Sequence, residues 1–546
     1  MNIVLHDPRT ASGSPMPRPE GPRPATAPRS WKPFYWFTAV LTLLTLQLFC
    51  GTQPAFAALV ALFCLLTYGA VMAAGGLMSL TGVMVFYLAA QNVLIAQVAK
   101  VVFWQPADSH LLQPLTTMGV YDAGMFGIYA AAALFRRSRL SRRPPLIAPE
   151  VDPTRLMWVA YISTGLFLFQ AVFTRAASVD AETGAQNTGG LFGLLQAIPF
   201  LFTLAVASGT AYIIVSSQGR RSLGLVNLIP LAVGMALGVL GASREALPDA
   251  VGIYFLTCYA FRFRFRPIHF GVLVAGLYTA QFIFFPYALY ARSIVRTPDM
   301  QKNVQMAASA LLDVLSDPVK FQQREYESKL KTSWKYNYFG KAYPTLDRFA
   351  QISVADAVIN TAMGQPNSEM DTITPGFLNV PPRFLLPDKP THSTNTVIAH
   401  RVPGMLNKKD KGTGISMGYF CDAFASFSWL GAFCIPFAIM FGLLWAYSVI
   451  ISLRLWQNIY ALCFILTMPH FFSEAVIESQ IVLVLQTPVV FVVVVYLILF
   501  LVSFAMRAQV RIQEAKQRAT RLGRARLAGR RLGLPPRGPA GGNNAG

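Results

Sequence analysis

The sequence predicts an all-α protein that crosses a membrane about twelve times and carries one large polar loop domain. The prediction rests on composition, on runs of apolar residues and on the placement of basic residues. Of the 546 residues, 54% are hydrophobic and 13% are charged, and the mean hydropathy is +0.45. Soluble chains carry about 25% charged residues. The chain therefore has too few charges to cover several soluble domains, and too many apolar residues to be mainly disordered.

Twelve apolar segments approach the length of about 20 residues that a membrane-spanning helix needs. They lie near 34–50, 55–74, 81–99, 118–135, 156–173, 191–215, 223–241, 248–263, 268–290, 426–448, 458–475 and 481–505. Several contain proline, which spanning helices tolerate because neighbouring helices can satisfy the freed backbone groups.

The remaining segments define the predicted domain organisation. Residues 1–33 are rich in Pro, Arg and Ser and are predicted to be a disordered cytoplasmic tail. Residues 34–290 hold spans one to nine and residues 426–505 hold spans ten to twelve. Residues 291–425 form a polar loop domain, expected to be helical first and then Pro-rich and extended. Residues 506–546 form a basic, disordered cytoplasmic tail.

Basic residues predict the orientation of the spans, because cytoplasmic connections are enriched in Lys and Arg. Basic runs occupy 136–143, 218–221 and 262–266, and the tail after residue 506 carries ten Lys or Arg and one Glu. Twelve crossings then place both termini in the cytoplasm and the 291–425 segment on the opposite, outer face. The net charge of +21 is explained by this orientation, so no nucleic-acid partner is predicted.

Several classes of chemistry lack their sequence signatures. The six cysteines lie far apart and form no C-x-x-C pair, so neither a disulfide framework nor a metal site is predicted. The chain contains no G-x-x-x-x-G-K-[ST], H-E-x-x-H or G-x-S-x-G motif, and no cofactor is predicted. An enzyme of this design would need an activated substrate that reaches it on the outer face.

Four charged residues stand near the outer ends of predicted spans. Arg244 and Glu245 lie between spans seven and eight, where a charge at membrane depth costs at least about 2.5 kcal/mol and suggests function. The alternative is an ion pair at the membrane interface. Arg292 and Arg296 follow span nine, one helical turn apart, and could together hold a pyrophosphate. They could equally anchor the helix to lipid headgroups.

The polar loop supplies further candidates. Arg383 and Lys389 lie in PPRFLLPDKP, where proline stiffens the backbone and fixes the layout of the charges. A rigid structural loop is the alternative. His400 is a possible general base beside Arg401, and Asp422 opens the tenth span. Structural roles are favoured for four other polar residues: Arg348, His470, Glu474 and Glu478.

The stretch PPRFLLPDKPTHSTNT, followed by GTGISMGYFCDAFASFSWLGAF, resembles the membrane oligosaccharide repeat-unit polymerases of the O-antigen polymerase (Wzy-like) superfamily. That family carries a P-R-x-x-x-P-x-K-P stretch late in a large outer loop. The residues that fit this stretch are Pro382, Arg383, Pro387, Lys389 and Pro390. A second family motif opens the next span and is matched loosely by Gly418, Asp422 and Gly431, with Asp in place of the usual Glu. The resemblance extends from about residue 240 to 450, and GASRE around Arg244 is also similar to the family.

The resemblance implies a GT-C-like membrane glycosyltransferase of the bacterial inner (cytoplasmic) membrane. Such an enzyme polymerises undecaprenyl-pyrophosphate-linked repeat units into O-antigen or exopolysaccharide on the periplasmic face and releases undecaprenyl pyrophosphate. Its partners would be these lipid-linked glycans, membrane lipid, and a chain-length regulator and flippase of the same pathway.

The resemblance also suggests roles for the candidate residues. Arg244, Arg292 and Arg296 would handle pyrophosphate, whose negative charge grows as it leaves. Binding of glycan or phosphate would fall to Arg383, Lys389 and Arg401. The catalytic base stays open among three residues, which are His400, Asp422 and Glu245.

Two other functions compete with polymerisation. An O-antigen-ligase-type transferase would deliver the glycan to another acceptor, and His400 beside Arg401 would suit its base. A lipid-linked glycan flippase or other transporter would place ionisable residues in the middle of its spans. The predicted spans hold almost none, so the sequence favours an enzyme.

Overall fold

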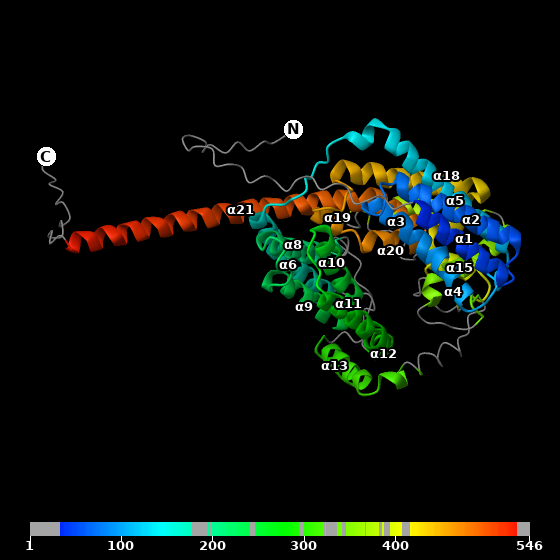
Figure 1. Ribbon diagram of the computed structural model, residues 1–546, viewed down its shortest axis with the longest axis horizontal. Coiled ribbons are helices and arrows are strands. Elements are labelled where there is room, and N and C mark those ends of the chain that lie inside the picture. The colour runs from blue at the N-terminus through cyan, green and yellow to red at the C-terminus, as the bar shows by residue number, and fades with distance from the viewer. Residues whose placement is uncertain are drawn as a thin grey trace.

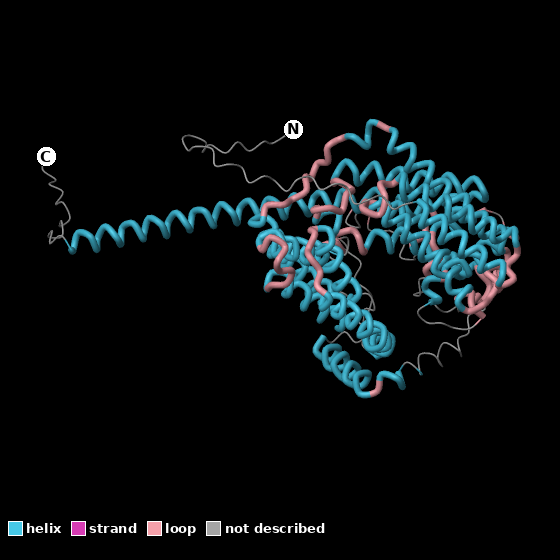
Figure 2. Tube along the Cα trace, viewed as in Figure 1, coloured by secondary structure: helices cyan, strands magenta, loops and turns pink. Residues whose placement is uncertain are grey.

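The computed structural model describes residues 33–176, 195, 198–240, 246–294, 300–321, 323, 336–340, 346–365, 367–381, 385–386, 394–406 and 415–531. Within these ranges the chain forms helices and turns, two isolated bridges and no strand, which confirms the all-α prediction (Figure 2). The first part contains α1 (Pro33–Phe49), α2 (Pro54–Ala73), α3 (Leu80–Ala89), η1 (Ala90–Leu94), α4 (Ile95–Val102), α5 (Pro114–Arg137), η2 (Arg139–Arg142) and α6 (Pro153–Ala176).

The middle part contains α8 (Leu201–Ser216), α9 (Leu225–Leu240), α10 (Ala246–Ala260), α11 (Pro267–Thr279), η3 (Ala280–Phe284), α12 (Phe285–Ile294) and α13 (Met300–Ser316). It is followed by η4 (Leu346–Phe349), α15 (Gln351–Met363), η5 (Glu369–Asp371), α16 (Ile373–Asn379) and α17 (Thr394–Arg401). The last part contains α18 (Tyr419–Ile450), α19 (Ile459–Leu462), α20 (Thr467–Glu474) and α21 (Ile477–Arg531).

Seven helical runs among the described residues are long and apolar enough to cross a membrane, as expected of a helical membrane protein. They are Pro54–Ala73, Leu80–Val102, Pro114–Arg137, Pro153–Thr174, Pro267–Ala288, Tyr419–Ile450 and Ile477–Arg521. Each of the twelve predicted segments overlaps a helix, but helices such as Leu201–Ser216 and Leu225–Leu240 are shorter. The number twelve therefore stays a prediction.

Connections from distant parts of the chain meet at one end of the helical bundle. The amide of Leu455 donates to the carbonyl of Met78 at 3.0 Å, and the amide of Ile147 donates to the carbonyl of Ile450 at 2.8 Å. The amide of Gln457 donates to the carbonyl of Ala260 at 3.4 Å. We call this region the basic end; it comprises residues 138–152, 261–266 and 451–458, and includes the basic connections after α5 and α10.

The opposite end, here called the loop end, comprises residues 50–53, 103–113 and 346–406 where these are described. The amide of Ala107 donates to the Thr52 hydroxyl at 2.8 Å. Helix α15 attaches through Asp356, which accepts hydrogen bonds from the amide of Gln113 at 2.9 Å and the hydroxyl of Thr117 at 2.7 Å. Among the described residues of the segment 291–425, helix α16 overlaps the start of the stretch that is expected to be Pro-rich and extended, and α17 begins at its end. Helix α16 packs against α21, a tertiary contact that local sequence does not reveal.

Two groups of helices build the bundle, as Figure 1 shows. Helices α1–α5, α15 and α18 form one group, and α6 with α8–α12 forms the other. Within the first group α5 and α18 approach closely, because Gly127 has no side chain: a Cβ there would lie 2.4 Å from the carbonyl oxygen of Phe433. Helix α21 contacts both groups and then extends beyond the bundle.

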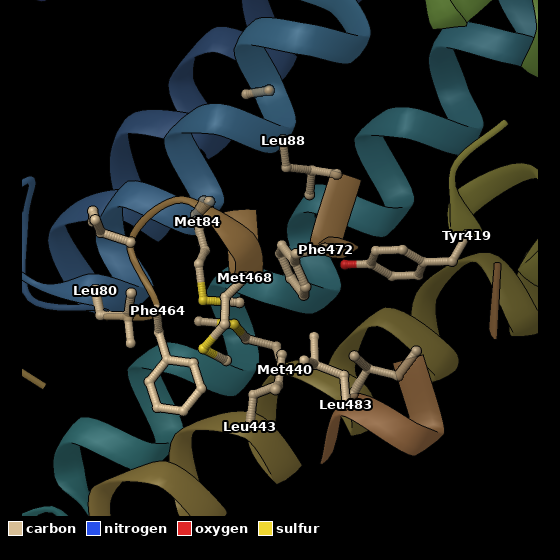
Figure 3. Packing of buried hydrophobic residues seen from close by; sticks show 14 of the residues in the cluster. Leu80, Met84, Leu88, Tyr419, Met440, Leu443, Phe464, Met468, Phe472 and Leu483 are labelled. Atoms are coloured by element: carbon tan, nitrogen blue, oxygen red, sulfur yellow. The ribbon is translucent and has the colours of Figure 1, made fainter. Parts of the chain in front are cut away.

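The helices α3, α18, α20 and α21 share a core in which buried side chains interlock (Figure 3). Met84 of α3 and Met468 of α20 point towards Met440 of α18. Methionine is flexible and fills irregular gaps between helices. This core fixes α20 against α3, and that contact builds the polar cluster described next.

Candidate functional site

A cavity of about 690 Å³ lies between α3–η1, α10 and the segment 455–474. Its wall at the basic end includes Met78, Ala260 and Leu455, and its wall at the loop end includes Gln91 and Asp249. Val83 and Gln91, which both line the cavity, are separated by about 12 Å along their helix, at 1.5 Å per residue. The cavity therefore extends over at least about two fifths of a hydrocarbon core of roughly 30 Å.

The lining of the cavity is apolar over most of its length and polar at the loop end. The apolar lining comes from Val83, Tyr87, Leu256, Leu462, Ile465 and Leu466, and Phe285 contributes from α12. The polar lining comes from Gln91, Asp249, Arg348, Thr467, His470 and Glu474. Such a cavity fits a long apolar chain that carries a polar group at one end.

Glu474 is the centre of this polar lining. Its carboxylate accepts hydrogen bonds from the side-chain amide of Gln91 and, at 2.7 Å, from the hydroxyl of Ser416. Nδ1 of His470 lies 3.4 Å from Oε1 of Glu474, one helical turn away. The side chains of His470 and Glu474 are 32% and 20% exposed. Histidine beside a carboxylate, both facing a partly dry cavity, is a pair that can accept and hold a proton.

The local structure explains why these groups meet. The π-helical turn η1 interrupts the helix that α3 begins, and such turns are frequent at functional sites. Gln91 and Asn92 lie in this turn: Gln91 accepts a hydrogen bond from the Ser473 hydroxyl at 2.5 Å, and Asn92 accepts one from the Tyr121 hydroxyl at 3.1 Å. Position 418 favours glycine for two reasons. Its backbone has φ +73°, and a Cβ there would lie 3.1 Å from the carbonyl oxygen of Ser473.

A second polar cluster fixes the start of α21. Glu478 accepts hydrogen bonds from the amide of Thr394 at 3.0 Å and from the side chain of Asn379 at 2.5 Å. Oδ2 of Asp422 accepts the amide of Ile477 at 2.9 Å. Asp422 is fully buried, and its Oδ1 has no hydrogen-bond partner among the described residues.

Two of the sequence-predicted residues come together beside this cluster. Asp422 and Arg401 line a separate small cavity of about 40 Å³. Arg401 also donates to Asp371 at 2.9 Å on the exposed surface. His400 is exposed on α17. None of these three residues lines the large cavity.

Other predicted residues cannot be placed. Arg244, Glu245, Arg296, Arg383 and Lys389 lie outside the described residues. Arg292 lies in α12, and the described part of the structure does not include its side chain. The large cavity instead brings together Gln91, Arg348, His470 and Glu474. The signal that could have identified them is polarity within otherwise apolar segments, such as Gln91 in the third predicted span.

Comparisons with known proteins add no assignment. A scan against protein-family models, a search of curated proteins and a search of solved structures each found no match. The resemblance to repeat-unit polymerases therefore stays a prediction from the sequence.

Proposed function

We propose that this protein is a membrane transferase that joins undecaprenyl-pyrophosphate-linked oligosaccharide repeat units on the periplasmic face of a bacterial inner membrane. The observation that carries the proposal is the large cavity, which is apolar over most of its length and carries the side chains of Gln91, His470 and Glu474 at the loop end. An isoprenoid chain matches the apolar part, and a pyrophosphate-linked sugar matches the polar part. The motif resemblance between residues 240 and 450 supports the same substrate class.

The proposed reaction needs no energy source beyond its substrates. The bond between the donor sugar and its pyrophosphate breaks, and the acceptor hydroxyl oxygen forms the new glycosidic bond. The electron pair leaves with undecaprenyl pyrophosphate, and cationic side chains that face this group lower the barrier. Arg348 lines the polar end of the cavity, and we assign it to the pyrophosphate together with Arg244, Arg292 and Arg296.

The acceptor hydroxyl must lose its proton to a base. We assign this step to the pair His470 and Glu474, because both residues line the large cavity and are in mutual contact. Histidine is the side chain that most often serves as a general base, and a carboxylate at its other nitrogen orients the ring. Asp422 is a weaker candidate, since it is fully buried beside the separate small cavity.

The proposal includes twelve spans with both termini in the cytoplasm. Its support is geometric: the basic connections after α5 and α10 share one end of the bundle, and α15–α17 share the other. Cytoplasmic connections are enriched in Lys and Arg. We therefore assign the basic end to the cytoplasm and the loop end to the periplasm.

Purified protein and lipid-linked repeat units test the function directly. Wild-type protein should convert single repeat units into products that carry two or more repeats, with release of undecaprenyl pyrophosphate. A cell that lacks the protein should accumulate single-repeat products if it is a polymerase, and unattached full-length polymer if it is a ligase. Transfer of intact lipid-linked glycan across a liposome membrane without chain growth would contradict the enzyme proposal and favour a flippase.

A further inference from the structure

The basic end of the large cavity carries a cluster that the proposed reaction does not use. The rings of Tyr259 and Trp456 lie 5.4 Å apart, and both residues line the cavity. The guanidinium carbon of Arg262 lies 5.4 Å from the centre of the Trp456 ring. An arginine over an indole ring makes a favourable cation–π contact, so the cluster holds a positive charge beside the basic end of a largely apolar cavity.

Arg262 adopts a backbone conformation that usually belongs to glycine. Its φ is +57°, and it ends α10: its amide donates to Tyr259 at 3.0 Å, and the next amide, of Phe263, donates to Cys258 at 2.8 Å. Glycine is the residue that most often occupies this position after a helix. An arginine held in a left-handed conformation suggests that its exposed side chain has a use.

Trp456 offers a hydrogen-bond donor for which the described residues provide no acceptor. Its indole Nε1 is buried and has no partner in that part of the chain. Buried polar groups are nearly always hydrogen-bonded, so an unpaired one demands an explanation. This N–H is closed to solvent, so a ligand would meet the Arg262 guanidinium over the ring and not the edge of the indole.

The surroundings of the cluster indicate what that ligand is. Exposed arginines adjoin it at positions 264, 266 and 454, so the ligand should be an anion. Leu77, Met78 and Leu455 line the cavity next to Trp456, so the ligand should also carry an apolar chain. A free phosphate would satisfy the first condition only.

We propose that the basic end of the cavity binds an anionic glycerophospholipid from the adjacent membrane leaflet. Its phosphate would contact the exposed Arg262 guanidinium, which the Trp456 ring holds in place, and one acyl chain would enter the cavity between Met78 and Leu455. Anionic lipids attract basic groups at membrane surfaces, and arginine binds phosphate through two parallel hydrogen bonds. The site does not depend on the proposed transferase activity.

Binding of defined lipids to the full-length protein tests the site. Protein purified in detergent and stripped of lipid is titrated with phosphatidylglycerol or phosphatidylcholine, and bound lipid is counted by native mass spectrometry. Wild-type protein should prefer phosphatidylglycerol. Arg262→Gln should weaken that lipid about tenfold, a change of about 1.4 kcal/mol, and Trp456→Phe should weaken it several-fold. The matched control is Arg220→Gln, an exposed arginine of the 217–224 connection, which should bind like wild type.

Arg262→Gly separates lipid binding from folding. Glycine accepts φ +57° without strain, so this variant should fold at least as stably as wild type and still lose the preference for phosphatidylglycerol. Retained preference in Arg262→Gly would overturn the proposal, as would equal binding of both lipids by wild type. Inorganic phosphate should displace none of the bound lipid; full displacement would mean a small-anion site and would also overturn it.

Discussion

The hydroxyl of Thr117, near the start of α5, donates a hydrogen bond to the carboxylate of Asp356 in α15 at 2.7 Å. The same carboxylate accepts the backbone amides of Leu112 at 2.5 Å and Gln113 at 2.9 Å. A negative charge at the N-terminus of a helix also interacts favourably with the helix dipole. Asp356 therefore attaches the loop end to a membrane-spanning helix, and the position of the polar cluster depends on that attachment.

Removing the Asp356 carboxylate should loosen the loop end. Asp356→Ala leaves three donors without their acceptor, and each buried unsatisfied group costs about 1–3 kcal/mol. The variant should unfold at a lower temperature. Native-state hydrogen exchange should become faster in residues 351–363, and change less in the helices α2 and α5. Asn360→Ala is a suitable control, since it removes a single longer contact to Gln113 at 3.2 Å. Equal exchange in wild type and Asp356→Ala would show that other contacts hold α15.

The stability of the protein should depend on the ionisation of Asp356. Burial raises the pKa of Asp356, and the hydrogen bonds from Leu112, Thr117 and Gln113 oppose this rise. The folded pKa thus exceeds the unfolded value of about 3.9. The folded state then binds the proton more tightly, so this residue stabilises the protein below about pH 4, and that contribution is lost as the pH rises through the folded pKa. Melting temperatures measured from pH 4 to pH 7 should therefore decline more steeply in wild type than in Asp356→Asn.

The close approach of α5 and α18 makes Gly127 intolerant of substitution. A Cβ at this position would lie 2.4 Å from the carbonyl oxygen of Phe433, so Gly127→Ala must push the helices apart. Overpacking of this kind costs about 1–3 kcal/mol. A Cβ at Gly165 in α6 would meet nothing within 4 Å, so Gly165→Ala should instead stabilise its helix by about 0.5–1 kcal/mol. Thermal unfolding in detergent compares the two, and similar melting temperatures would contradict the packing argument.

Substitutions in the polar cluster should lower transferase activity without unfolding the protein. His470→Asn should reduce turnover by about 10²–10⁴-fold, the usual contribution of a general base. Glu474→Gln should reduce turnover less and shift the pH profile, because it changes the group that orients the histidine. Arg220→Gln with Arg221→Gln serves as control: both arginines are exposed in the connection between α8 and α9, and turnover should stay unchanged. Wild-type turnover and pH profile in His470→Asn would exclude this pair as the base.

Sequence reasoning found the apolar helices because their signal is local. The segment predicted at 55–74 and the helix Pro54–Ala73 nearly coincide. The breaks within these helices are not predictable in the same way. The π-turn Ala90–Leu94 and the end of α20 at Glu474 have no residue signature. The bend in α18, where Ser428 has φ +53°, has none either. These breaks arise from packing between helices that are distant in the sequence.

The candidate site shows the same contrast between local sequence signals and contacts between distant segments. Motif and residue type predict Asp422 and His400 as site residues, and the structure places them away from the large cavity. Gln91 and Glu474 meet across 383 positions of the chain, so no local pattern could pair them. Polarity inside an apolar segment is the available signal, and by itself it favours structural roles for His470, Glu474 and Arg348.

The assignment of the loop end to the periplasm can be tested by labelling single cysteines. Met370 and Leu146 are 51% and 59% exposed, at the loop end and the basic end respectively. In intact cells a membrane-impermeant maleimide should label Met370→Cys and leave Leu146→Cys unlabelled until the membrane is permeabilised. Of the six native cysteines five are buried, and the exposed Cys434 lies within the apolar run of α18, so wild type is the background control. Labelling of Leu146→Cys alone would reverse the orientation. The polar end of the cavity would then face the cytoplasm, and a periplasmic transferase would be excluded.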